Sequence, residues 1–362
     1  MFWDEQALRM VGCLDRFRRP ERQVQVLGND PRKAVRGEVL TMTRIAIVRP
    51  VLWLSFAATV WAQGGDSNYK PRRFNKAIEL LEDGQPIYNS SARGGDGYDA
   101  GVKLAATYND FIIYEMEDAE FNIAALRQFM LGLSSGGPTK SGHRMPAVIV
   151  TLPVVGYDEA SVRANVWMIQ QVLAAGVMGI ELCHARSPEA VKMLITASRY
   201  PIERPNIQKN DLQEGLRGAG SESFAAKIWG MSAKQYRELA DPWPLNPKGE
   251  LMMALKIEDK YALANAEKVA AVPGIAFAEW GPGDMGLSLG FADNHNPPYP
   301  PAMAAARKRV MAANKAAHIG FLETVKMDSI EALFKEGTNV THGSSLELVN
   351  KGRKLTDRKM PW

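Results

Sequence analysis

An alternation of short apolar runs with longer amphipathic stretches begins after residue 74 and continues almost to the end of the chain. Most of the short runs are apolar on both faces, as strands of a parallel sheet must be when helices cover both sides of it. We predict strands at 86–90, 111–117, 147–152, 178–183, 252–257, 274–280, 318–323 and 339–341. Such strands are buried only when helices flank the sheet, so the pattern predicts an α/β fold.

The stretches between these strands repeat apolar residues on one face, at the spacing of a helix. Helices are predicted at 123–133, 159–175, 188–198, 260–271, 302–317 and 329–336. Eight strands that alternate with helices over roughly 280 residues favour a (β/α)8 TIM barrel, which we place at 75–362. A doubly wound open sheet is the alternative, but the loop at 92–97 lacks the glycine spacing of a dinucleotide-binding turn.

The positive charge of the chain is concentrated in its first 62 residues, which carry ten Lys and Arg against six Asp and Glu. The remaining 300 residues carry 34 of each and balance to zero. A neutral body has no bulk electrostatic attraction for nucleic acid or for an anionic membrane. We therefore expect no nucleic-acid partner for the barrel.

Residues 1–62 predict a leader that ends in a signal peptide. The uninterrupted apolar run at 51–62 is short for a membrane span, and its last three residues fit the small-x-small rule for cleavage before Gln63. Met42 lies just upstream and is a candidate for the true start. Cleavage would export the protein to the periplasm or the medium and leave 63–74 as a polar linker, with no membrane span in the mature form. A core helix or an uncleaved anchor is the alternative, and without a signal the protein would be cytoplasmic.

In a barrel of this kind, active-site chemistry belongs at the carboxyl ends of the strands. The residues that follow the predicted strands form a largely polar set, and barrel geometry alone would bring several of them together around one mouth. The set is Glu115, Glu117, Asp118, Thr151, Pro153, Cys183, His184, Glu258, Asp284, Glu323 and His342.

Two acids of this set have the layout of a metal site. Glu258 and Asp284 each stand where a predicted strand ends, and Asp284 follows a Gly-Pro-Gly turn at 281–283. Mg²⁺ and Mn²⁺ prefer oxygen ligands and retain several waters, so two carboxylates on neighbouring strands suffice. Each acid could instead cap the helix that follows it, but strand order and the surrounding motifs favour the metal. A Pro-rich loop at 295–299 could help to close the site or a subunit contact, or could serve only as a connector.

Several short segments occur in an order that is shared with one known family. Residues 280–290 (WGPGDMGLSLG) look like its G-P-x-D-L-S-x-S-L-G segment, and residues 256–258 look like its Q-x-E strand end. Residues 117–121 stand where it has E-H-G-P-F, while 199–201 and 217–218 resemble its R-Y-P-P and R-G landmarks. Over roughly 75–345 the chain therefore resembles the HpcH/HpaI aldolase and citrate lyase family.

The resemblance implies a modified (β/α)8 barrel, often a hexamer with a C-terminal helix exchanged between subunits, so we expect a homo-oligomer, either a trimer or a hexamer. It implies Mg²⁺ or Mn²⁺ on Glu258 and Asp284, chelated by a 2-keto acid such as pyruvate or oxaloacetate. The expected activity is that of a carbon–carbon lyase, which cleaves an aldol adduct through a metal-stabilised enolate. The turn of Gly281, Pro282 and Gly283 would hold the substrate carboxylate with backbone N–H groups.

Three positions depart from the pattern of the family. A His after the second strand, which belongs to the acid/base machinery of the family aldolases, is Asp118 here, and an Arg at the end of the third strand is Thr151. Lys256 replaces a Gln two residues before the metal ligand. The change of His to Asp removes a group that titrates near neutrality, and the change of Arg to Thr removes a fixed positive charge.

Three explanations remain open for a chain with these departures. In the first, Asp118 and Glu117 manage protons, and Lys256 or Arg217 supplies the missing positive charge. In the second, a histidine at another strand end, His184 or His342, is the base. In the third, the aldol machinery is lost, and the barrel binds a metal and a keto acid without aldol turnover or with different chemistry.

Overall fold

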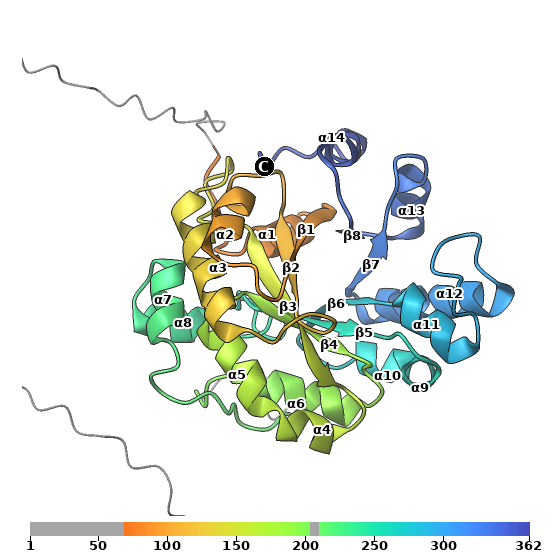
Figure 1. Cartoon of the computed structure of the whole chain (residues 1–362), viewed down its shortest axis with the longest axis horizontal. Helices are drawn as coiled ribbons and strands as arrows, with labels where there is room; N and C mark the ends of the chain where they lie inside the picture. The colour runs from red at the N-terminus through yellow and green to blue at the C-terminus, as the bar shows by residue number, and fades with distance from the viewer. Residues whose placement is uncertain (1–68, 203–209) are drawn as a thin grey trace, which may run out of the picture. The chain divides into compact units, whose positions relative to one another are not determined.

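The computed structural model describes residues 69–202 and 210–362 (Figure 1). The predicted leader at 1–62 and the first part of the predicted linker lie outside the described residues. The described remainder of that linker, 69–74, packs against helix α1 (Lys76–Glu82), because the backbone N–H groups of Arg72 and Arg73 donate to Oε2 of Glu79 at 2.8 and 2.9 Å. This short segment is therefore held against the domain that follows it.

Eight strands form a closed parallel barrel, in which each strand pairs with the next along the chain and β8 returns to β1. The strands are β1 Ile87–Arg93, β2 Phe111–Glu115, β3 Ala147–Val155, β4 Gly179–Cys183, β5 Met252–Lys256, β6 Ile275–Glu279, β7 Gly320–Thr324 and β8 Val340–His342. Each lies where an apolar run predicted it, so the (β/α)8 barrel is confirmed. Most strand residues are buried on both faces, which is why these runs lack polar alternation.

Helices surround the strands, as Figure 1 shows. After α1 they are α2 Tyr98–Ala105, α3 Ile123–Gly136, α4 Glu159–Ala164, α5 Val166–Ala174, α6 Pro188–Ser198, α7 Ser223–Trp229, α8 Ala233–Leu239, α9 Lys260–Ala264, α10 Ala266–Ala270, α11 Pro282–Leu289, α12 Pro301–Ala317, α13 Ile330–Glu336 and α14 Leu346–Leu355. The periodicity does not predict α1, α2, α8 or α14. Within the two described ranges, no helix is long and apolar enough to cross a bilayer.

Two stretches that the periodicity predicts as single helices are each divided by an asparagine. The break between α4 and α5 falls at Asn165, and the break between α9 and α10 falls at Asn265. In both, the backbone N–H bonds to the carbonyl three residues earlier at 3.0 Å, which tightens the turn. The side chain of Asn265 also donates to the carbonyl of Arg186 at 2.8 Å. Asparagine side chains compete in this way for backbone hydrogen-bond partners. The apolar residues therefore keep the spacing of a helix across a point where the helix itself is interrupted.

A buried ion pair joins the C-terminal segment to the amino end of the barrel. Asp110, immediately before β2, accepts hydrogen bonds of 2.7 and 2.5 Å from the guanidinium of Arg358, and its Oδ1 lies 3.0 Å from the ammonium of Lys76. All three side chains are fully buried. Because Arg358 follows α14, these contacts hold the end of the chain at the face of the barrel opposite the carboxyl ends of the strands.

Candidate active site at the barrel mouth

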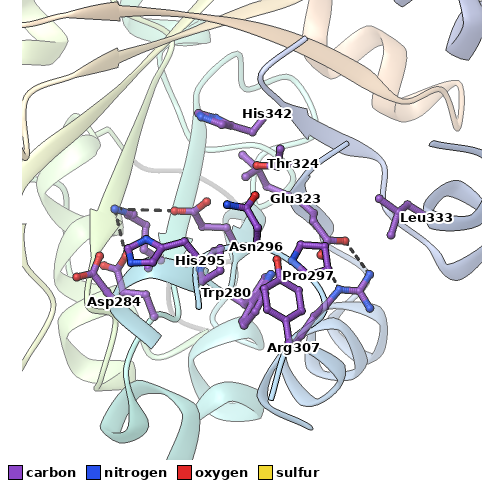
Figure 2. A pocket seen from close by; sticks show the side chains of 18 of the residues that line it. Trp280, Asp284, His295, Asn296, Pro297, Arg307, Glu323, Thr324, Leu333 and His342 are labelled. Atoms are coloured by element: carbon purple, nitrogen blue, oxygen red, sulfur yellow. Dashed lines mark hydrogen bonds and ion pairs between the residues drawn. The ribbon is translucent and has the colours of Figure 1, made fainter. Parts of the chain in front are cut away.

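The carboxyl ends of the strands open into a cavity of about 590 Å³. This size lies within the range of roughly 300–1,000 Å³ that is usual for small-molecule sites. Figure 2 shows Asp284 at one end of the cavity, with His295 beside it, and Arg307 and Leu333 at the other end. The cavity therefore occupies the position where barrel geometry places active-site chemistry.

Glu258 lies at the floor of this end of the cavity, directly after the residue that follows β5. Its side chain is fully buried. One carboxylate oxygen, Oε1, accepts the backbone N–H of His184 at 2.9 Å. The other, Oε2, is buried and has no hydrogen-bond partner within the described part of the chain. A buried carboxylate oxygen that accepts no hydrogen bond is costly, so this atom is a candidate ligand for a cation.

The turn before α11 packs directly against this carboxylate. Gly281 has φ +47, and a Cβ added to it would lie 2.5 Å from Cβ of Glu258 and 2.8 Å from its Oε2. Only glycine fits such a position, because both the conformation and the contact exclude a side chain. The turn brings Asp284, in the first turn of α11, to the same cavity.

The alternative interpretation of the two acids as helix caps does not hold for Glu258. The residue that caps α9 is Asp259, whose Oδ1 accepts the N–H groups of Tyr261 and Ala262 at 2.9 and 2.8 Å. Helix α11 begins after Gly281, which has no side chain with which to cap it. The carboxylates of Glu258 and Asp284 are therefore left facing the cavity.

Glu117, His184 and Glu258 each offer a ligand atom, and these atoms lie within 4.8 Å of one another. The His184 ring is fixed by Asp259, whose Oδ2 lies 2.9 Å from Nδ1, and this hydrogen bond is the main reason that the pKa of His184 is raised. The backbone of His184 has φ +48, an uncommon conformation for a non-glycine residue. Carboxylate and imidazole donors together suit Mn²⁺ and related divalent metals.

Burial raises the pKa of Glu258 to about 7, although the ammonium of Lys256 opposes the shift. The Nζ of Lys256 forms a close ion pair with Oε2 of Glu117, lies 3.1 Å from Oε2 of Glu258, and lies 3.9 Å from Oε1 of Glu279. Lys256 and Glu279 are partners in the register of β5 and β6. The positive charge that the sequence places at position 256 thus lies among the carboxylates of Glu117, Glu258 and Glu279.

The other predicted site residues divide into those at the cavity and those away from it. Thr151 lines the cavity, and its hydroxyl donates to Oε2 of Glu181 at 3.1 Å. Asp118 is exposed and does not line the cavity. Arg217 is buried elsewhere, with its guanidinium 4.3 Å from the ring centre of Tyr200. The structure therefore brings Thr151 to the predicted site and leaves Asp118 and Arg217 outside it.

Several cavity residues are absent from the prediction. Glu181 and Glu279 point into the barrel from β4 and β6, and each is a lone acid in an apolar run, which is the sequence signal that could have revealed them. Arg307 of α12 is also new, whereas the Pro-rich loop, which the sequence offered as a closure of the site, supplies His295 and Asn296. Cys183, in contrast, is a buried residue whose thiol donates to the carbonyl of Leu152 at 3.2 Å.

A family model described as HpcH/HpaI aldolase/citrate lyase matches residues 152–348. The 2-keto-3-deoxy-L-rhamnonate aldolase of Escherichia coli O9:H4 is 28% identical over 173 residues, which cover 48% of this chain and 57% of that protein. The hydroxypyruvate/pyruvate aldolase of Roseobacter denitrificans is 24% identical over 250 residues, which cover 69% of this chain and 83% of that protein. The solved structure of an HpcH/HpaI aldolase/citrate lyase family protein from Burkholderia cenocepacia J2315 matches with a TM-score of 0.58 and 20% identity, over 78% of this chain and 98% of that one.

The fold and the carboxylates at its mouth define a (β/α)8-barrel protein with a candidate divalent-metal centre. The chain belongs to the HpcH/HpaI aldolase/citrate lyase family, whose model matches more than half of it. Divalent-metal dependence is a property of this family, and the buried oxygen of Glu258, which accepts no hydrogen bond and lies beside Glu117 and His184, fits such a cation. The chain spans little more than half the length of the E. coli aldolase, 57%, and the similarity to the solved structure shows the fold alone.

Proposed function

We propose that this protein is a divalent-metal-dependent carbon–carbon lyase that acts on a 2-keto acid or its aldol adduct, as a homo-oligomer. The observation that carries the proposal is the packing of the Gly281 turn against Glu258, which places two carboxylates and a helix N-terminus at one end of a single cavity. The names of the relatives from E. coli and R. denitrificans, both aldolases, support the same class of reaction.

Glu258 and Asp284 would hold the metal, Mg²⁺ or Mn²⁺, and Glu117 or His184 can complete the donor set. When bound, the metal supplies a Lewis acid for the keto oxygen. The burial of Glu258 keeps this end of the cavity poorly solvated, so charges there act on one another more strongly than in water. The protein's own contribution is to fix these donors on rigid strand ends and a tight turn.

The turn at the start of α11 is suited to the carboxylate of the substrate. Pro282 occupies the first helical position, and Met285 is the first residue whose N–H bonds back to the carbonyl of Gly281. The N–H groups of Gly283 and Asp284 thus stand in the first turn, where helix N–H groups have no partner within the helix. These groups and the positive end of the helix dipole favour an anion.

The other end of the cavity has a different chemistry and suits the second product of cleavage. Trp280 and Tyr299 meet edge to face with their ring centres 4.8 Å apart, and Leu322 and Leu333 add apolar wall. Arg307 is paired with Glu323 through two hydrogen bonds of 2.5 and 2.7 Å. An aldehyde partner of moderate size therefore fits beside the keto acid within the one cavity.

Turnover of oxaloacetate, and of pyruvate with an aldehyde, in the presence of Mn²⁺ tests the proposal. The variant Glu258→Gln should lower both the Mn²⁺ affinity and kcat/KM by roughly 100-fold or more, because it replaces an ionised ligand with a neutral amide. The matched control is Glu331→Gln, an exposed acid on α13 that pairs with Lys335, and it should change neither quantity. An unchanged Mn²⁺ affinity in Glu258→Gln would show that the metal site is wrongly placed.

A second candidate function is a barrel that binds a metal and a keto acid without aldol turnover. Two residues at positions of the family's aldol machinery favour it. Asp118 is exposed, and the hydroxyl of Thr151 already donates a hydrogen bond to Glu181. Oxalate, which mimics an enolate, separates the two candidates. Tight, metal-dependent oxalate binding with no conversion of any keto acid would support the binding function and refute the proposed lyase activity.

A further inference from the structure

The side chain of Lys256 occupies the centre of the carboxylate group at the barrel mouth. Its ammonium contacts Glu117 in a close ion pair, lies 3.1 Å from Oε2 of Glu258, and lies 3.9 Å from Oε1 of Glu279. The side chain is 13% exposed. These three acids come from the segment after β2, the end of β5 and the end of β6, so one ammonium bridges three parts of the barrel wall.

Two of these partners are also members of the candidate metal group. Glu117 and Glu258 offer ligand atoms that lie, with those of His184, within 4.8 Å of one another. The ammonium therefore contacts the carboxylates that a divalent cation would need. The ammonium does not fully satisfy Glu258, because Oε2 of this residue gains no hydrogen bond of acceptable geometry from the nearby Nζ.

The negative charge at the mouth exceeds what one ammonium can neutralise. In addition to its three contacts, the cavity wall carries Glu115 and Glu181. Oε1 of Glu181 is buried without a hydrogen-bond partner in the described residues. The guanidinium of Arg307, at the other end of the cavity, is engaged by Glu323 and Glu336, so it does not relieve this excess. The group consequently has both an internal cation and the capacity to take an external one.

We propose that Lys256 is a tethered cation that occupies the divalent-metal position between Glu117 and Glu258, and that the metal and the ammonium exclude each other from these carboxylates. When the metal binds, the ammonium moves to Glu279, which already lies 3.9 Å away and is its partner in strand register. The inference rests on the proposed function only in placing the metal at Glu258.

Geometry and charge together make the two states exclusive. A small divalent cation needs its ligand oxygens at about 2.0–2.1 Å, whereas an ammonium bonds a carboxylate at about 2.7–2.9 Å. Both cations on Oε2 of Glu258 would bring three positive charges to one fully buried carboxylate. Glu279 offers the ammonium a carboxylate outside the group of Glu117, His184 and Glu258. Lys256 thereby offsets the repulsion between the carboxylates in the metal-free protein and lowers the metal affinity.

Titration of the protein with Mn²⁺ alone, followed by electron paramagnetic resonance of the free ion, tests the exclusion. The variant Lys256→Met should bind Mn²⁺ at least about tenfold more tightly than wild type, since no internal cation competes. The control is Lys326→Met, which removes a lysine from the wall of the same cavity away from these acids, and it should not change the affinity. An affinity of Lys256→Met that is equal to or weaker than that of wild type would overturn the proposal.

A double-mutant cycle tests the second position of the ammonium. In the wild-type background, Glu279→Gln should weaken Mn²⁺ binding, because the displaced ammonium loses its alternative partner. In the Lys256→Met background, the same substitution should have a much smaller effect. Equal weakening in both backgrounds would show that Glu279 acts on the metal directly, and would overturn its assignment as the alternative partner.

A measurement on the wild-type protein covers the case in which Lys256→Met fails to fold. Acetic anhydride acylates accessible lysines, and mass spectrometry quantifies each site. Added Mg²⁺ should raise the labelling of Lys256 several-fold and leave that of Lys326 unchanged. Labelling of Lys256 that stays the same or falls with Mg²⁺ would contradict displacement. These readouts involve no turnover, so a protein that passes them and converts no keto acid would refute the proposed lyase and leave this inference standing.

Discussion

Gly281 and Glu258 are in direct contact: a Cβ at Gly281 would lie 2.5 Å from Cβ of Glu258 and 2.8 Å from its Oε2. This contact joins the end of β5 to the turn that starts α11, two segments that are 23 residues apart in the numbering. It fixes the height of the Glu258 carboxylate relative to the first turn of α11, which carries Asp284. The metal site that the sequence predicts therefore depends on a residue with no side chain.

Gly281→Ala should damage the site more than it damages the fold. The substitution places a Cβ in a left-handed conformation, at a cost of about 1–3 kcal/mol, and pushes the Glu258 carboxylate aside. We expect a loss of at least about tenfold in Mn²⁺ affinity, measured by titration, together with a lower unfolding temperature. Gly84→Ala is the matched control, since Gly84 also has positive φ but nothing lies within 4 Å of its added Cβ. It should lower stability alone, and an equal loss of Mn²⁺ affinity there would refute the role of the contact.

The sequence predicts the barrel well because the strands are buried on both faces. A run such as 147–152 can be satisfied only inside a sheet covered by helices, so its position and length are visible without any tertiary information. The sequence also predicts that Glu258 and Asp284 line one cavity, because the carboxyl ends of parallel strands meet at one edge. The sequence does not show where a side chain competes with the helix for backbone partners. The break of a helix at Asn165, for example, leaves the apolar period unchanged.

The sequence could not predict which charges meet inside the barrel. Lys256 appears in it as a positive charge two residues from Glu258, but its contact with Glu117 depends on side-chain direction across three strands. Asp118 aligns with a catalytic position and nevertheless faces solvent. The loop with His295 reaches the cavity only because the chain folds back after α11. These contacts depend on how the elements pack in three dimensions, and a single sequence does not show which side chains then face each other.

Asp110→Asn should strongly destabilise the protein, because it leaves Lys76 and Arg358 as buried charges without a carboxylate to neutralise them. Burial alone raises the pKa of Asp110, but Arg358 and Lys76 outweigh it and hold the pKa at about 2. The ionised pair therefore contributes stability that is present above the unfolded pKa of about 3.9 and is lost as the pH falls through about 2. We expect a loss of about 3–5 kcal/mol in the free energy of unfolding at pH 7, measured with denaturant.

The control for this substitution is an exposed ion pair in the same segment. Lys359→Met removes the partner of Asp357, and both side chains of that pair are largely in solvent. It should change the free energy of unfolding by less than about 0.5 kcal/mol. A loss in Asp110→Asn as small as that in Lys359→Met would mean that Arg358 does not hold the C-terminal segment in place.

His143 should make the protein less stable in mild acid. Burial lowers the pKa of His143 to about 4, although Glu79, 3.2 Å from its Nε2, acts in the opposite direction. Between about pH 6.5 and 4 the unfolded chain binds the proton and the folded chain does not, so stability falls as the pH falls through that window. The loss is roughly 3 kcal/mol at about 1.4 kcal/mol per pKa unit.

Denaturant unfolding of wild type and His143→Gln between pH 7.5 and 4, with a chelator present, measures this contribution. The amide can still donate to Glu79 but does not titrate, so the variant should lose less stability than wild type over the window. His318→Asn, at an exposed histidine, is the control and should follow wild type. Parallel curves for wild type and His143→Gln would assign the acid sensitivity to other groups.

The predicted signal peptide lies outside the described residues, and export remains a proposal. Expression of the full chain in a bacterium with a secretory pathway, followed by N-terminal sequencing of the product, tests it. We expect the mature chain to begin at Gln63, since the three residues before it fit the cleavage rule. A product from the periplasm that begins at Met1 or Met42 would contradict cleavage, and one found only in the cytoplasm would contradict export.

Glu181→Gln should make the protein more stable than wild type as the pH rises from acid to neutral. Burial raises the pKa of Glu181 well above its usual range, and the neighbouring carboxylate of Glu279 adds to the rise. Glutamine has the shape and neutral charge of the protonated acid, and its carbonyl can still accept the hydroxyl of Thr151. A raised pKa contributes stability that is complete below the unfolded value of about 4.3 and is lost as the pH rises through the folded value. Glu181→Gln should therefore match wild type within about 0.5 kcal/mol near pH 4 and exceed it in stability as the pH rises above about 4.3. Denaturant unfolding at pH 4 and pH 7 measures both, and a variant about 2 kcal/mol less stable than wild type at pH 7 would show that the acid is ionised and held by a cation.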